Sequence, residues 1–121
     1  NYSPAQTKVP LKIIWPNRDS DNFSFRSSHH DFAPTLLKEV LGCSNSYSDY
    51  STGNNLFDQK PWNYLIAGSY DSFAVMTREK AIISYGSYFE VRDQNYNPTE
   101  IKDTDYRDIK DAMSDMSEYY K

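Results

Sequence analysis

The middle of the chain carries its clearest alternation of apolar and polar residues. Between Ala81 and Val91 the odd-numbered residues are mostly apolar and the even-numbered ones mostly polar. A period of two is typical of a strand with one buried face. The run from Ser72 to Arg78 is also rich in strand-forming residues, and the polar connector 78–80 has hairpin length. These stretches predict a β-hairpin whose odd-numbered face forms one wall of a core.

Three other apolar runs are interpreted as strands. Val9 to Trp15 is rich in β-branched and aromatic residues, which favour extended structure. Because Pro10 has no N–H to donate to a neighbouring strand, we expect the start of this strand to lie at a sheet edge or at the point where the chain enters the sheet. We also expect a strand from Trp62 to Ala67, and Phe23 to Arg26 could be a short returning strand.

A helix is predicted from Asp31 to Leu41. Asp31 suits the N-cap position, and Gly42 is well placed to end the helix in a left-handed conformation. The apolar residues between them have helical spacing and predict one core-facing stripe; they are Phe32, Leu36, Leu37, Val40 and Leu41. We expect Cys43, the only cysteine, to be a small buried residue under the helix end.

A second helix is predicted from about Thr104 to Tyr120, with Asp103 or Thr104 as its N-cap. Its apolar stripe is expected to face the odd-numbered side of the hairpin and consists of Ile109, Ala112, Met113, Met116, Tyr119 and Tyr120. The opposite face carries an acidic ridge, which consists of Asp108, Asp111, Asp115 and Glu118. Such a ridge is usually a solvated face, but it also suits a basic partner.

The remaining stretches are interpreted as loops. Residues 1–8 are expected to be loosely ordered, residues 44–55 form a flexible loop rich in Tyr, Ser and Asn, and residues 93–98 have turn chemistry. The order of elements predicts an α+β fold: a small, mostly antiparallel sheet with two helices packed on it. At 121 residues we expect one domain spanning the whole chain.

The amino-acid composition argues against several classes of function. The formal net charge of −4 argues against a nucleic-acid binder, which needs clustered Lys and Arg. No apolar run reaches the length of a membrane span. One cysteine cannot form an intramolecular disulfide or a zinc cluster. Eleven Tyr and two Trp indicate a core that relies on aromatic residues.

Candidate catalytic chemistry is sparse. His29 and His30 are adjacent, so in an extended segment they point to opposite sides and cannot easily serve one metal or one substrate. A small hydrolase or nuclease that uses one of them, with Arg18 or Arg26 steadying an anion, is the alternative hypothesis. The stretch 19–22 opens like a calcium loop but lacks the later Gly and Glu. We expect no catalytic, cofactor or metal site.

The sequence contains more residues suited to protein recognition than to catalysis. Tyr47 and Tyr50 stand among Ser and Asn in the loop 44–55, a mixture that binding loops use. Tyr88 adds an aromatic side chain on the outward face of the predicted hairpin. Together with the acidic ridge, these residues predict a non-enzymatic protein-binding domain with a basic protein partner. The more specific hypothesis is an inhibitor of the immunity-protein type that neutralises a basic toxin such as a nuclease. If the two surfaces lie on opposite sides, the ridge is the expected main interface.

A third hypothesis is an exported structural or surface module. The sequence opens at Asn1 without a methionine, and no signal-like segment is present. We expect that a leader was removed or the chain was shortened, with an exported or periplasmic location slightly favoured over a cytoplasmic one.

Overall fold

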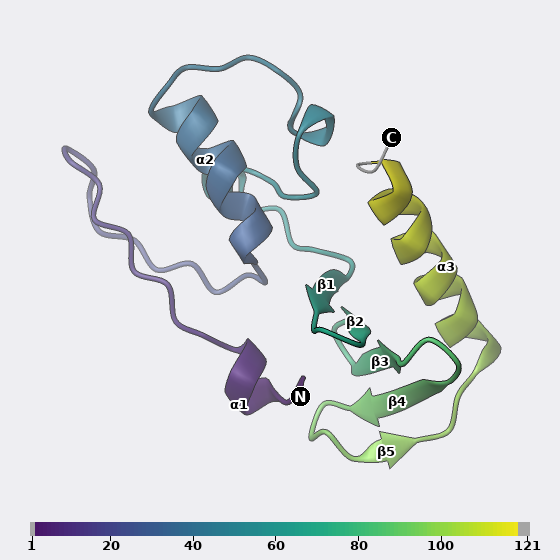
Figure 1. The fold of residues 1–121 in the computed structure, drawn as a ribbon. Coiled ribbons are helices and arrows are strands. Elements are labelled where there is room, and N and C mark those ends of the chain that lie inside the picture. The colour runs from purple at the N-terminus through teal and green to yellow at the C-terminus, as the bar shows by residue number, and fades with distance from the viewer. Residues whose placement is uncertain (1, 119–121) are drawn as a thin grey trace. The chain divides into compact units, whose positions relative to one another are not determined.

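The computed structural model describes residues 2–118. The chain divides into two compact units (Figure 1). The first, here called the sheet unit, comprises residues 1–18 and 63–121, and the second, the α2 unit, comprises residues 19–62. A five-stranded antiparallel sheet and two longer helices confirm the predicted α+β class.

The sheet is a meander in which each strand pairs with the next along the chain (Figure 1). Every pairing is antiparallel. The strands are β1 (Leu65–Gly68), β2 (Phe73–Met76), β3 (Lys80–Ser84), β4 (Phe89–Asp93) and β5 (Pro98–Thr99). The strand predicted at 62–67 is present as β1 but begins only at Leu65. The predicted hairpin across residues 78–80 is confirmed as β2–β3, and residues 94–97 form the predicted turn.

The alternating run from Ala81 to Val91 is two strands, so the prediction of one long strand was wrong. Gly86 interrupts it with a φ of 83°, a left-handed conformation that glycine adopts without steric cost. The backbone N–H of Tyr85 donates to the carbonyl oxygen of Tyr88 at 3.0 Å and closes the turn. The chain therefore reverses between β3 and β4.

This reversal also corrects the predicted core face. Ile82 pairs directly with Val91, so an even-numbered residue of β3 shares a face with an odd-numbered residue of β4. Both pack with Ile109 on that face. Ile83 lies on the opposite face, where it packs with Ala74 and Tyr2. The sheet thus buries apolar side chains on both faces, which alternation alone did not indicate.

The C-terminal helix α3 (Asp103–Ser117) is confirmed. Ile109 and Ala112 are buried as predicted, but Met113 is about half exposed, so its assignment to the core was wrong. The buried residues of the helix are Asp105, Ile109 and Ala112, a narrower strip than the predicted stripe. Met116 is half-buried, and the predicted contributions of Tyr119 and Tyr120 lie outside the described residues.

The N-terminal segment departs from prediction. Residues 8–15 belong to no helix or strand, and neither do residues 23–26, so the strands predicted at Val9–Trp15 and Phe23–Arg26 were wrong. Before them lies the single-turn helix α1 (Pro4–Thr7). Tyr2 is buried, and its hydroxyl donates to the carbonyl oxygen of Ser72 at 2.7 Å. One anchored side chain therefore joins the start of the chain to the sheet.

The α2 unit contains the helix α2 (Phe32–Glu39) and three 3₁₀ turns, η1 (His29–Asp31), η2 (Tyr47–Asp49) and η3 (Leu56–Asp58). The predicted helix is confirmed with shorter bounds. Gly42 has the predicted left-handed conformation, with a φ of 68°. Cys43, predicted to be buried, is half-buried. Asp31 occupies the predicted N-cap position of α2, but its side chain makes no capping hydrogen bond to this helix.

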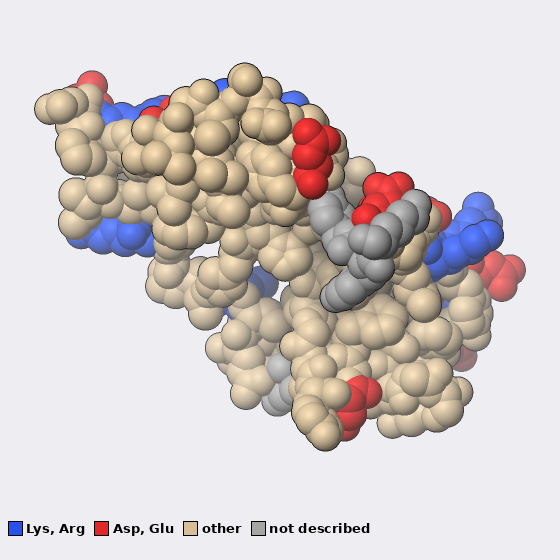
Figure 2. All heavy atoms as spheres, turned by 45° about the horizontal axis from the view of Figure 1, so that its top comes forward, with Lys and Arg blue, Asp and Glu red and all other residues tan. Residues whose placement is uncertain are grey.

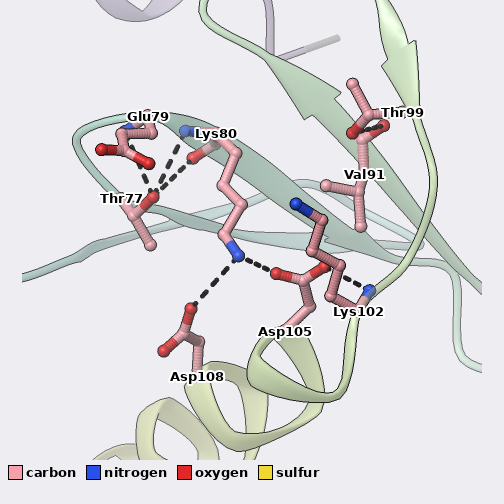
Figure 3. Close-up of polar contacts among 8 residues, drawn as sticks. All are labelled: Thr77, Glu79, Lys80, Val91, Thr99, Lys102, Asp105 and Asp108. Carbon is pink, nitrogen blue, oxygen red and sulfur yellow. Dashed lines mark hydrogen bonds and ion pairs between the residues drawn. The ribbon is translucent and has the colours of Figure 1, made fainter.

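An ion pair links α3 to the sheet. The Asp105 carboxylate, 1% exposed, accepts from the ammonium group of Lys80 and, at 2.8 Å, from the backbone N–H of Lys102 (Figure 3). Asp108 lies 3.8 Å from the same ammonium group. Because Lys80 begins β3 and Asp105 lies in the first turn of α3, this contact sets where the helix starts against the sheet.

We expect Asp105→Asn to lower the free energy of unfolding of the sheet unit by about 2 kcal/mol, since it leaves a partly buried ammonium group without its main partner. Chemical denaturation followed by circular dichroism measures this loss. Asp103→Asn is the matched control, because Asp103 is exposed in the same turn; it should cost less than about 1 kcal/mol. Equal losses for the two variants would contradict the assigned role of Asp105.

Candidate functional site

A buried carboxylate organises the α2 unit. Asp31 is 2% exposed, and its Oδ2 atom accepts from the backbone N–H of Ser28 at 2.6 Å and from the indole N–H of Trp62 at 3.0 Å. Its Oδ1 atom accepts from the backbone N–H of Asn54 at 2.7 Å. A buried carboxylate needs such donors to offset its desolvation. Asp31 therefore joins three segments that are distant in sequence.

Further hydrogen bonds attach the end of the loop 44–55 to α2. The Thr35 hydroxyl donates to the carbonyl oxygen of Asp31 at 2.6 Å and accepts from the backbone N–H of Leu56 at 2.9 Å. The Asn55 amide donates to the Glu39 carboxylate at 2.6 Å. Gly53 lies so close to His30 that a Cβ atom would collide with the carbonyl oxygen of His30. Hydrogen bonds therefore hold α2 in its unit, beside the buried ring of Pro34.

Part of the apolar side of α2 is exposed. Phe32, Leu36 and Val40 follow at intervals of four residues and lie on one side of the helix, where Leu36 is half-buried. Val40 is 59% exposed and the adjoining Leu41 is 67% exposed, while Phe32 is also exposed. We call these four residues the α2 apolar row. The prediction that this stripe faces a core was wrong for Phe32, Val40 and Leu41, which are exposed, whereas Leu36 and Leu37 are half-buried.

The two tyrosines predicted in the binding loop are partly engaged within the same unit. The Tyr47 ring lies under the Lys38 ammonium group, 5.5 Å from ring centre to nitrogen, and its hydroxyl donates to Asp58 at 3.4 Å. The Tyr47 hydroxyl and the Asp58 carboxylate raise the pKa of Lys38. Tyr50 is half-buried, and desolvation raises the pKa of its hydroxyl. Both tyrosines retain some exposed surface.

The other predicted binding residues belong to the sheet unit. Tyr88 is exposed and stacks on Tyr85, with ring centres 4.8 Å apart. Burial and the neighbouring Glu90 carboxylate raise the pKa of Tyr85. Tyr88 lies in the turn between β3 and β4 rather than within a strand, because Gly86 breaks the predicted strand. The structure therefore does not bring Tyr88 together with Tyr47 and Tyr50 in one unit.

Two residues of the acidic ridge on α3 already have partners within the sheet unit. Asp108 lies near the Lys80 ammonium group, and Asp115 accepts a hydrogen bond from the Tyr64 hydroxyl. Asp111 and Glu118 are exposed. The exposed residues Arg107 and Lys110 stand among these acids in the sequence. Figure 2 likewise shows acidic and basic side chains in several small groups separated by uncharged residues. Nearby charges of opposite sign weaken the attraction for a basic partner.

Both histidines are exposed. The Nδ1 atom of His30 is hydrogen-bonded to the Thr52 hydroxyl. Among residues 2–118, no group of three or more His, Cys, Asp or Glu side chains could hold a metal ion. No helix in the described part of the chain is both long enough and apolar enough to span a membrane.

Sequence reasoning missed the network around Asp31, although a signal was present. Ser28 and Asp31 have the spacing of a capping box, in which each residue satisfies a backbone N–H near the other. The contribution of Trp62 had no such local signal, because that residue lies 31 positions away.

We expect Asp31→Asn to lower the free energy of unfolding of the α2 unit by about 2 kcal/mol, since an amide cannot accept from all three donors. Trp62 fluorescence during urea unfolding, in a Trp15→Phe background, measures this change next to the substituted group. Asp49→Asn, at an exposed position in the same unit, is the control and should have little effect. If the control shifts the unfolding midpoint as much as Asp31→Asn, the central role of Asp31 is wrong.

Comparison with known proteins gives partial similarities. No family model matches this chain. It is 25% identical over 84 residues to the inner membrane protein YejM of Salmonella typhimurium and, with the same values, to that of Salmonella typhi; the match covers 69% of this chain and 14% of YejM. An uncharacterised protein of Haemophilus influenzae is 31% identical over 69 residues, which cover 57% of this chain and 12% of that protein. The chain thus spans a small part of the length of the curated relatives it matches.

Proposed function

We propose that this chain is a non-enzymatic protein-binding module and that the α2 apolar row is its binding surface. The observation that carries the proposal is the inverted burial of α2. Val40 and Leu41 at the end of the helix are 59% and 67% exposed, whereas Asp31 at its N-cap and Thr35 are buried. Contiguous exposed apolar residues often mark a surface that another protein covers.

The energetics support a partner at this surface. Covering apolar area contributes about 25 cal/mol per Å², so burying several large side chains of the row would contribute several kcal/mol. Directional hydrogen bonds from Asn55 and Leu56 hold α2 in its unit and orient the helix together with its apolar row. A preorganised apolar surface loses little conformational entropy on binding, which favours affinity.

The partial match to YejM supports a partner within a larger protein. The similarity covers 69% of this chain but only 14% of YejM, an inner membrane protein by its name. We propose that this chain is a module of a YejM-like polypeptide and that the α2 apolar row packs on another part of it. This version is close to the hypothesis of an exported structural or surface module.

The other functional hypotheses stay predictions. An inhibitor of the immunity-protein type depends on the acidic ridge, where Asp108 and Asp115 already have partners within the sheet unit. A hydrolase that uses His29 or His30 remains the enzymatic alternative. No specific contact of the described residues favours either over binding through the α2 apolar row.

The test separates the chain from the rest of the polypeptide that its gene encodes. The two fragments are produced independently and their association is measured by titration calorimetry. We expect binding, and we expect Val40→Glu with Leu41→Glu to weaken it at least about tenfold, because two carboxylates would be desolvated at the interface.

Ser44→Glu is the matched control, since it adds a carboxylate at an exposed position just beyond the same helix. It should leave the affinity unchanged, and circular dichroism should show that all the variants keep their helix content. Absence of binding by the unaltered fragment, or equal affinity for the doubly substituted one, would contradict the proposal.

A further inference from the structure

A second apolar segment lies in the sheet unit without secondary structure. In residues 9–14, Val9 is 60% exposed, Leu11 58% and Ile14 85%, and Ile13 is also exposed. The stretch 8–15 belongs to no helix or strand. A run of large aliphatic side chains exposed in this way is unfavourable for a chain surrounded by water.

The composition of this segment is that of a strand with one apolar face. In an extended conformation Val9, Leu11 and Ile13 share one face, and Ile14 lies on the other beside Lys12. Alternation of this kind is typical of a strand that is covered by apolar groups on one face. Pro10 removes one N–H near the start, but every residue from Leu11 to Trp15 keeps its backbone donor. The segment can therefore both donate and accept in a ladder.

The position of the segment suits such a role. Upstream, Tyr2 is anchored: its hydroxyl donates to the carbonyl oxygen of Ser72, and its N–H donates to the Tyr96 hydroxyl at 3.1 Å. Downstream, Asn17 has a φ of 61° and turns the chain. Between these points, seven extended residues span about 23 Å, somewhat more than a common strand length.

We propose that residues 9–15 form a strand in a β-sheet contributed by the part of the YejM-like polypeptide that lies outside these 121 residues. The inference rests on the proposed function, because it requires that this chain is a module of a larger protein. The partner strand is assigned to the rest of the polypeptide because of relative length. The matched region is 14% of YejM, so most of such a polypeptide lies outside the similarity. Main-chain hydrogen bonds would supply affinity, and alternating apolar side chains would set the register.

Amide hydrogen exchange tests this pairing. We compare the exchange rates of residues 11–15 in the polypeptide expressed from the complete gene and in the isolated 121-residue chain. Exchange at least about tenfold slower in the complete polypeptide supports the inference, because ladder hydrogen bonds protect amides. Fast exchange in both forms overturns it. Slow exchange in both also overturns it, since the partner strand would then lie within this chain.

A substitution provides a second readout. Ile13→Pro removes one ladder donor and should return the flanking amides to fast exchange in the complete polypeptide, whereas Ser20→Pro, at an exposed position after the segment, should not. Binding of the two separated fragments distinguishes the two proposals. If the fragments bind but residues 11–15 stay unprotected, only the strand inference fails; if they do not bind, the proposed function fails as well.

Discussion

A buried aspartate at the start of a helix stabilises each unit of this protein. Asp31 accepts from the backbone N–H of Ser28, three residues earlier, and Asp105 accepts in the same way from Lys102. In both places the aspartate N–H donates back to the carbonyl oxygen of the earlier residue. This reciprocal pairing satisfies backbone groups that the first turn of a helix leaves without partners. Each carboxylate then uses its remaining capacity on a distant group, Trp62 in one unit and Lys80 in the other.

The two units differ in what surrounds these carboxylates. In the sheet unit, Ile82, Val91 and Ile109 form an apolar core between the sheet and α3, and Asp105 sits at its edge. In the α2 unit, Asp31 and Thr35 are buried and hydrogen-bonded, while Val40 and Leu41 remain exposed. A helix of eight residues is too short to be stable alone, and its stability comes from these tertiary contacts. The polar interior and the exposed α2 apolar row are thus two consequences of one arrangement.

The functional interpretation follows from this imbalance rather than from charge. The excess of acidic residues suggested electrostatic docking, but several acids of α3 have partners within the sheet unit. The uncovered apolar side chains on α2 and in residues 9–14 represent a larger unmet free-energy gain. Apolar burial is the dominant favourable contribution in most protein association, whereas charge mainly affects encounter rate and orientation. The proposed module of a larger protein would account for both exposed surfaces.

The sequence by itself determined the α+β class, the β2–β3 hairpin, α3 and the left-handed conformation of Gly42 just beyond α2. These features depend on local periodicity and on the conformational preferences of single residues. Only the tertiary structure decided which side of α2 is buried, because periodicity identifies an apolar face but not the partner that covers it. It also decided the reversal at Gly86, since the alternation of apolar and polar residues runs through this turn in the sequence without a break. The hydrogen bond from the Trp62 indole to Asp31 spans 31 positions, and no local pattern encodes it.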